Sequence, residues 1–145
     1  MPVKAIGPKI SEESAAWLEK NFKNLNAGAT YILDAFPGLY ARTLHDLAGN
    51  FPRGELLAMV DVMNATWLTP GIAGQHLAIN VRDGIELDHL DQKWEIDGKV
   101  LNRKLTNLSI FALACLEIWI GAFWKQENHD NLEDWVKQFI QEGKQ

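Results

Sequence analysis

The sequence has little that would cross-link it, export it or attract it to polyanions. Cys115 is the only cysteine in 145 residues, and its apolar neighbours predict a small core residue in a reducing compartment. The first 30 residues contain several lysines and glutamates and no apolar run, so we expect no secretory signal and a cytoplasmic protein. Basic residues number 14 against 19 acidic ones, a formal charge of -5, so the chain as a whole is not a polycation.

A long hydrophobic run is also missing. The most apolar stretch, residues 110–124, contains one charged residue, Glu117. At 1.5 Å per residue it would cover roughly 22 Å, short of a hydrocarbon core of about 30 Å, and a charge at mid-membrane would cost several kcal/mol. The stretch therefore predicts a buried central helix.

What is present is helical periodicity interrupted by capping residues, prolines and glycines, without the alternation typical of strands. We predict a single all-α domain over residues 1–145, a multi-helix bundle of about seven or eight helices, with residues 50–145 as its main part. Nine helical segments, three of them short, are expected: at 12–23, from an Asn24 or Asn26 cap to 36, at 39–47 (short), from 50–52 to 67, at 70–83, at 88–94 (short), from an Asp97 cap to 105 (short), after a Ser109 cap, and at 132–140. Pro37-Gly38 and Asp83-Gly84 are expected to end helices.

The C-terminal segment has the clearest amphipathic pattern. Its apolar residues recur at i, i+3, i+4, i+7 and i+8: Leu132, Trp135, Val136, Phe139 and Ile140. Such a stripe needs a surface to cover it. Two alternatives stay open: the helix packs on its own core, or it packs on a partner protein or a second subunit.

Residues 3–36 are similar to the ribbon-helix-helix fold of small dimeric DNA-binding repressors. A short N-terminal strand or arm precedes a capped acidic helix start at Ile10-Ser11-Glu12-Glu13, and Asn26-Ala27-Gly28-Ala29 opens a second helix. The resemblance implies a homodimer whose paired strands enter the major groove. By position, Ala5, Gly7 and Lys9 would face the bases, Lys4 would add charge, and Asn26 would lie near phosphate. Ala5 and Gly7 offer no side-chain donor or acceptor to a base edge.

Two acidic residues lie within strongly apolar helical patterns, Asp61 and Glu117. A buried carboxylate must be paired, hydrogen-bonded or protonated, so both are candidates for acid-base chemistry, with His76 as a neighbouring partner. The structural alternative is that each acid pairs with a lysine, an arginine or a tryptophan indole.

Residues 83–97 hold six acidic residues and one lysine, which indicates a solvated acidic face or a surface for a basic protein. We find no phosphate-binding loop or nucleophile motif, and we assign no catalytic residue, metal or cofactor. Three functions follow as hypotheses: a non-catalytic dimeric helical regulator or adaptor that binds another macromolecule; a ribbon-helix-helix-type DNA-binding regulator; and a small-ligand or metal-binding enzyme using Asp61, His76 and Glu117.

Overall fold

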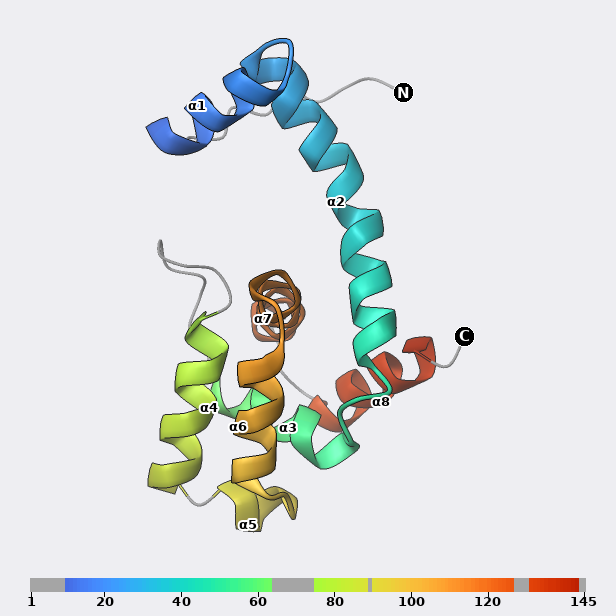
Figure 1. Cartoon of the computed structure of the whole chain (residues 1–145). Helices are drawn as coiled ribbons and strands as arrows, with labels where there is room; N and C mark the ends of the chain where they lie inside the picture. The colour runs from blue at the N-terminus through green and yellow to red at the C-terminus, as the bar shows by residue number, and fades with distance from the viewer. Residues whose placement is uncertain (1–9, 64–74, 89, 127–130, 144–145) are drawn as a thin grey trace. The chain divides into compact units, whose positions relative to one another are not determined.

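The structure, a computed structural model, describes residues 10–63, 75–88, 90–126 and 131–143. These residues form eight helices and no strand, which confirms the predicted all-α fold (Figure 1). In chain order the helices are α1 (Glu12–Asn21), α2 (Leu25–Leu47), α3 (Arg53–Val62), α4 (Gln75–Asp88), α5 (Leu90–Trp94), α6 (Gly98–Asn107), α7 (Ile110–Lys125) and α8 (Leu132–Gly143). The chain divides into two compact units, residues 1–39 and 40–145.

Side chains cap the helix starts that the sequence marks. The Ser11 hydroxyl accepts a hydrogen bond from Ser14 N, and the Asn24 side chain accepts one from Ala27 N at 2.8 Å, so Asn24 rather than Asn26 caps α2. The predicted Asp97 and Ser109 caps of α6 and α7 are both present. Each cap satisfies amide groups that the first turn of a helix leaves without a partner.

Two predicted helix ends are wrong. Helix α2 runs without a break through Pro37, where two helices were expected. A proline inside a helix removes one backbone hydrogen bond. The apolar periodicity continues on both sides of Pro37, and the helical segments on the two sides stabilise α2 by more than the loss of that one bond costs. Helix α4 likewise continues through Asp83-Gly84 to Asp88, because a glycine costs only about 1 kcal/mol in a helix interior. The predicted helix end at Trp67 and helix start at Thr69-Pro70 lie outside the described residues.

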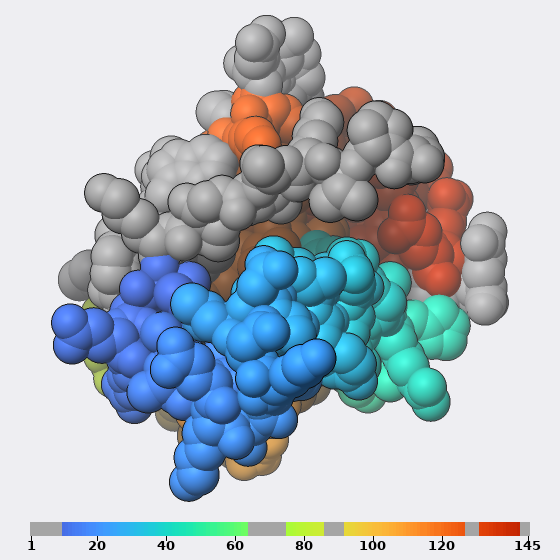
Figure 2. All heavy atoms as spheres, turned by 90° about the horizontal axis from the view of Figure 1, so that it is seen from above, coloured from blue at the N-terminus to red at the C-terminus, as the bar shows by residue number. Residues whose placement is uncertain are grey.

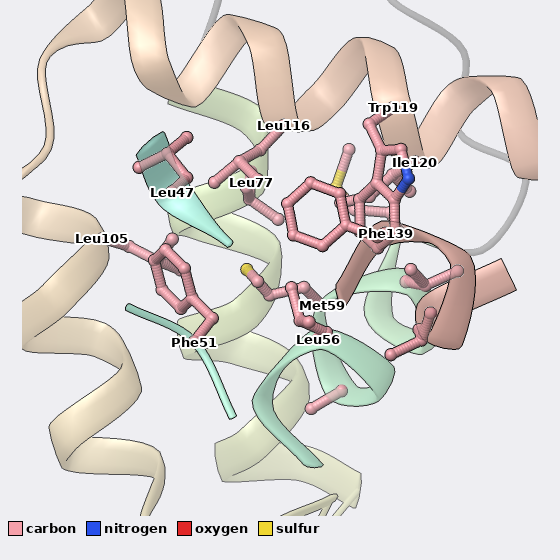
Figure 3. Close-up of a cluster of buried hydrophobic side chains, with 14 of the residues drawn as sticks. Leu47, Phe51, Leu56, Met59, Leu77, Leu105, Leu116, Trp119, Ile120 and Phe139 are labelled. Atoms are coloured by element: carbon pink, nitrogen blue, oxygen red, sulfur yellow. The ribbon is translucent and has the colours of Figure 1, made fainter. Parts of the chain in front are cut away.

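Unit 2 has one continuous hydrophobic core (Figure 3). Helix α7 contributes eight buried residues, which confirms that the apolar stretch 110–124 is a buried helix. It packs against α3 and α4, and α4 also packs against α6. Leu56, Leu77, Leu105 and Leu116 come from four of these helices and are among the largest fully buried side chains. No helix in the described residues is both long and apolar enough to span a membrane.

The C-terminal helix packs on its own chain. Val136 and Phe139 are buried, and Leu132, Trp135 and Ile140 pack against the same core. Helix α8 lies against α3, where Arg53 and Glu133 form an exposed ion pair. The structure therefore shows the first of the two alternatives, in which the apolar stripe packs on the core of its own chain. The second alternative, in which the stripe covers a partner protein or a second subunit, is wrong.

Candidate functional site

Glu117 lies in the middle of α7 and is completely buried, with its side chain 0% exposed. Its Oε1 accepts a hydrogen bond from Leu77 N at 2.8 Å and lies 3.9 Å from His76 Nδ1. Leu77 is in the first turn of α4, where amide groups point out of the helix and the helix dipole favours a negative charge. Glu117 therefore ties α7 to the start of α4.

Asp61 has different partners. Its Oδ2 accepts hydrogen bonds from Lys93 Nζ at 2.7 Å and from Trp94 Nε1 at 3.1 Å, and Lys93 also lies over the Trp94 ring at 5.0 Å. These contacts fasten the short helix α5 to the end of α3. The structure thus brings His76 and Glu117 together, while Asp61 pairs with a lysine and an indole, as its structural interpretation expected.

The sequence analysis missed a buried acid, Glu55 on α3, which is 5% exposed, whereas the Asp61 side chain is 28% exposed. Lys104 Nζ of α6 donates to Glu55 Oε1 at 2.7 Å and to the Asn50 carbonyl at 2.9 Å, and it lies over the Phe51 ring. The available signal was the position of Glu55 three residues after Pro52, within the first helical turn, next to two leucines. Its role is to connect α3, α6 and the preceding turn.

The acidic stretch 83–97 is partly used inside the fold. Asp83 pairs with Arg82, and Asp97 accepts from the amides of Lys99 and Val100. Within the described ranges no three histidine, cysteine, aspartate or glutamate side chains gather in a way that could hold a metal ion.

Of the residues that the ribbon-helix-helix resemblance assigned to DNA, the structure describes only Asn26. Lys4, Lys9, Ala5 and Gly7 lie outside the described residues. Asn26 lies in the first turn of α2 and is exposed. Two helices do follow the N-terminal segment in the expected order, but the second is 23 residues long.

Unit 1 is a hairpin of α1 and the first part of α2, and atoms of these two segments lie against each other in Figure 2. They approach closely at Gly28, where an added Cβ would lie 2.8 Å from the Phe22 ring and 3.0 Å from Leu18. Phe22 also contacts Trp17 and Tyr31, with ring centroids 6.0 and 5.6 Å apart. The hairpin is therefore a defined packing unit and not two unrelated helices.

An apolar groove of about 530 Å³ opens on this hairpin. Its walls are Ile10, Trp17, Leu18, Ala29, Ile32 and Leu33, and Glu13 and Ser14 lie at its edge. Leu18 is buried, whereas Trp17 and Leu33 are each about half exposed, at 52% and 51%. Much of the apolar surface of unit 1 is therefore uncovered.

No protein-family model matches the chain, and neither the curated proteins nor the solved structures contain a match.

Proposed function

We propose that this chain is a non-catalytic adaptor that acts as a homodimer, with the apolar groove of the α1–α2 hairpin as the dimer interface. The observation that carries the proposal is the groove itself, with Ile10, Trp17, Ile32 and Leu33 all at least 39% exposed. The ion pairs and hydrogen bonds of these acids support a non-catalytic role, because Glu55, Asp61 and Glu117 each hold two structural elements together.

The size of unit 1 argues for a partner. It spans 39 residues, and Leu18 is the only large apolar side chain buried in its described part. Domains below about 40 residues seldom bury enough surface to be stable alone. A second hairpin placed on the first would complete a four-helix arrangement, the common way for amphipathic helices to cover one another.

The exposed area fits a dimer. The four groove side chains are roughly half exposed, which leaves on the order of 400 Å² of apolar surface per chain. Interfaces are about 57% apolar, so this area corresponds to about 1,400 Å² buried in total by two chains, within the usual 1,200–2,000 Å². A two-fold axis lets the same groove serve both chains.

Size-exclusion chromatography with light scattering at micromolar concentration tests the proposal. We expect twice the chain mass for the wild type and one chain mass for Leu33→Glu, which places a charge in the groove. Leu39→Glu is the matched control, because Leu39 is similarly exposed on the same helix but does not line the groove. A monomeric wild type, or a Leu33→Glu variant that stays dimeric, would overturn the proposal.

DNA binding is the second candidate, favoured by the two capped helices that follow the N-terminal segment in ribbon-helix-helix order. A dimer would present Lys4 and Lys9 twice, and four phosphate contacts give a slope of roughly -3.6 in log K against log salt. Lys9→Ala should reduce the slope by about two units. A fluorescence titration with mixed-sequence duplex at 50 mM salt decides: no detectable affinity excludes this function.

A further inference from the structure

Helix α2 is the single covalent link between the two units. Unit 1 ends at Leu39 and unit 2 begins at Tyr40, so the boundary falls inside α2 and not in a loop. Pro37 and Gly38 come just before this boundary. The two residue types least compatible with a helix interior therefore lie at the junction of the two units.

The two ends of α2 are anchored by burial, and its middle is not. In unit 1 the buried residue of α2 is Gly28, which lies close to the Phe22 ring, and in unit 2 Leu44 and Leu47 are buried in the hydrophobic core. Between these anchors every residue from 29 to 43 is at least partly exposed. About four turns therefore lack a fully buried side chain, and a helix of this length without such burial is only marginally stable in water. The anchored ends keep α2 helical, but they do not protect its middle.

Pro37 weakens the helix within this exposed stretch. Its nitrogen carries no hydrogen, so the Leu33 carbonyl lacks the helical hydrogen bond that residue 37 would otherwise donate, and the proline ring crowds the same carbonyl. Sharp bends in helices occur mostly at prolines for this reason. Pro37 is itself exposed, so burial in the core does not explain its presence.

Gly38 weakens the same turn. A Cβ at this position would have no atom within 4 Å, so close packing does not require a glycine here, whereas it does at Gly28. A glycine has more backbone freedom than alanine and lowers the stability of a helix interior. Gly121 of α7 also has open space around it, but buried residues of the core surround it in the sequence. Pro37 and Gly38 together therefore mark the weakest turn of α2.

We propose that residues 33–38 of α2 form a hinge, at which the helix bends and transiently opens so that units 1 and 2 turn as separate bodies. The hinge concerns one chain and does not depend on the proposed dimer. A consequence that does rest on the dimer is that two hinges would give the two copies of unit 2 a range of separations. An adaptor with such hinges can hold its partners at variable spacing.

Distances between two spin labels, measured by pulsed electron paramagnetic resonance, test the hinge. Exposed positions in the two units are labelled through Lys20→Cys and Lys125→Cys, in a Cys115→Ala background. A large excess of unlabelled chain leaves only distances within one chain, whatever the oligomeric state. We expect a broad distribution across the hinge, and one about half as wide in Pro37→Ala/Gly38→Ala, because alanine restores the hydrogen bond and favours the helix.

Two controls make the result specific to the hinge. A label pair within unit 2, Arg103→Cys with Lys125→Cys, should give a narrow distribution that the double alanine variant leaves unchanged. Gly121→Ala is the same glycine change in the core helix α7, and it should leave the width across the hinge unchanged.

Amide hydrogen exchange provides a second measurement that needs no labels. The amides of residues 38–41 lie in the turn that follows Pro37, and the double alanine variant should slow their exchange at least about tenfold. A distribution across the hinge as narrow as that of the unit 2 pair would overturn the proposal. Equal widths or equal 38–41 exchange in the wild type and the double variant, or the same narrowing by Gly121→Ala, would also overturn it.

Discussion

Glu117 offers the most direct test of how this fold is held together. Replacing it by leucine keeps a similar volume but leaves Leu77 N, buried at the α7–α4 contact, without its acceptor. An unsatisfied buried donor costs about 1–3 kcal/mol, and a hydrogen bond to a charged group contributes about 1.5–3 kcal/mol. We expect Glu117→Leu to lower the free energy of unfolding by about 3 kcal/mol.

Glu117→Gln separates the hydrogen bond from the charge. The amide oxygen can still accept from Leu77 N, and only the charge assistance and the favourable helix-dipole term are lost. The expected loss is about 1 kcal/mol.

Urea unfolding at pH 7, followed by circular dichroism and tryptophan fluorescence, measures both variants against Glu19→Gln as an exposed control. For a chain of this length, 3 kcal/mol corresponds to a fall in Tm of roughly 6–12 °C. The reasoning is refuted if Glu117→Leu is as stable as the wild type, or if Glu117→Gln is as destabilised as Glu117→Leu.

Three further predictions concern glycines, a tyrosine and the cysteine. Gly98→Ala should destabilise the protein by about 1–3 kcal/mol in a thermal melt, because a Cβ at this position would lie 2.3 Å from Ile85. Gly121→Ala in α7 should stabilise it by about 0.5–1 kcal/mol, because a Cβ there would have no neighbouring atom within 4 Å. Similar effects of the two substitutions would contradict the packing described for Gly98. In a Tyr31→Phe background, absorbance at 295 nm should report a Tyr40 midpoint near pH 12, lower in urea. Because the folded-state pKa is the higher one, stability should be constant below pH 10 and fall as the pH rises from 10 to 12; coincident folded and unfolded midpoints would refute this. Burial raises the pKa of the Cys115 thiol, so a disulfide reagent should modify it on the order of 100-fold more slowly in the native chain than in urea, and equal rates would show that the thiol is accessible.

Local chemistry explains why most helix starts were predictable. Ser11, Asp97 and Ser109 act on amides two or three residues away, so the sequence alone contains both the donor and the acceptor. The helix ends predicted at Pro37 and Gly84 were wrong because a helix continues through one proline or glycine when packing along its whole length outweighs the local cost. That packing involves residues that are distant in the sequence.

The same difference between local and distant contacts decides how much of the candidate sites could be predicted. The sequence identified Asp61 and Glu117 as acids that need partners, but not the partners, because Lys93 lies 32 residues from Asp61 and Leu77 lies 40 from Glu117. Glu55 was missed because its amphipathic context resembles that of an ordinary first-turn acid, and only its contact with Lys104 reveals its burial.

By itself, then, the sequence determined the all-α class, the capped helix starts and the buried character of residues 110–124, since these depend on residue type and on spacings of three or four. Tertiary structure alone decided that the C-terminal stripe packs on its own chain and that the hairpin groove stays open in unit 1. It also decided that Tyr40, Trp119, Trp135 and Phe139 share one cavity. Burial of an apolar face depends on which other faces are near it in space, and periodicity along one helix carries no information about its neighbours.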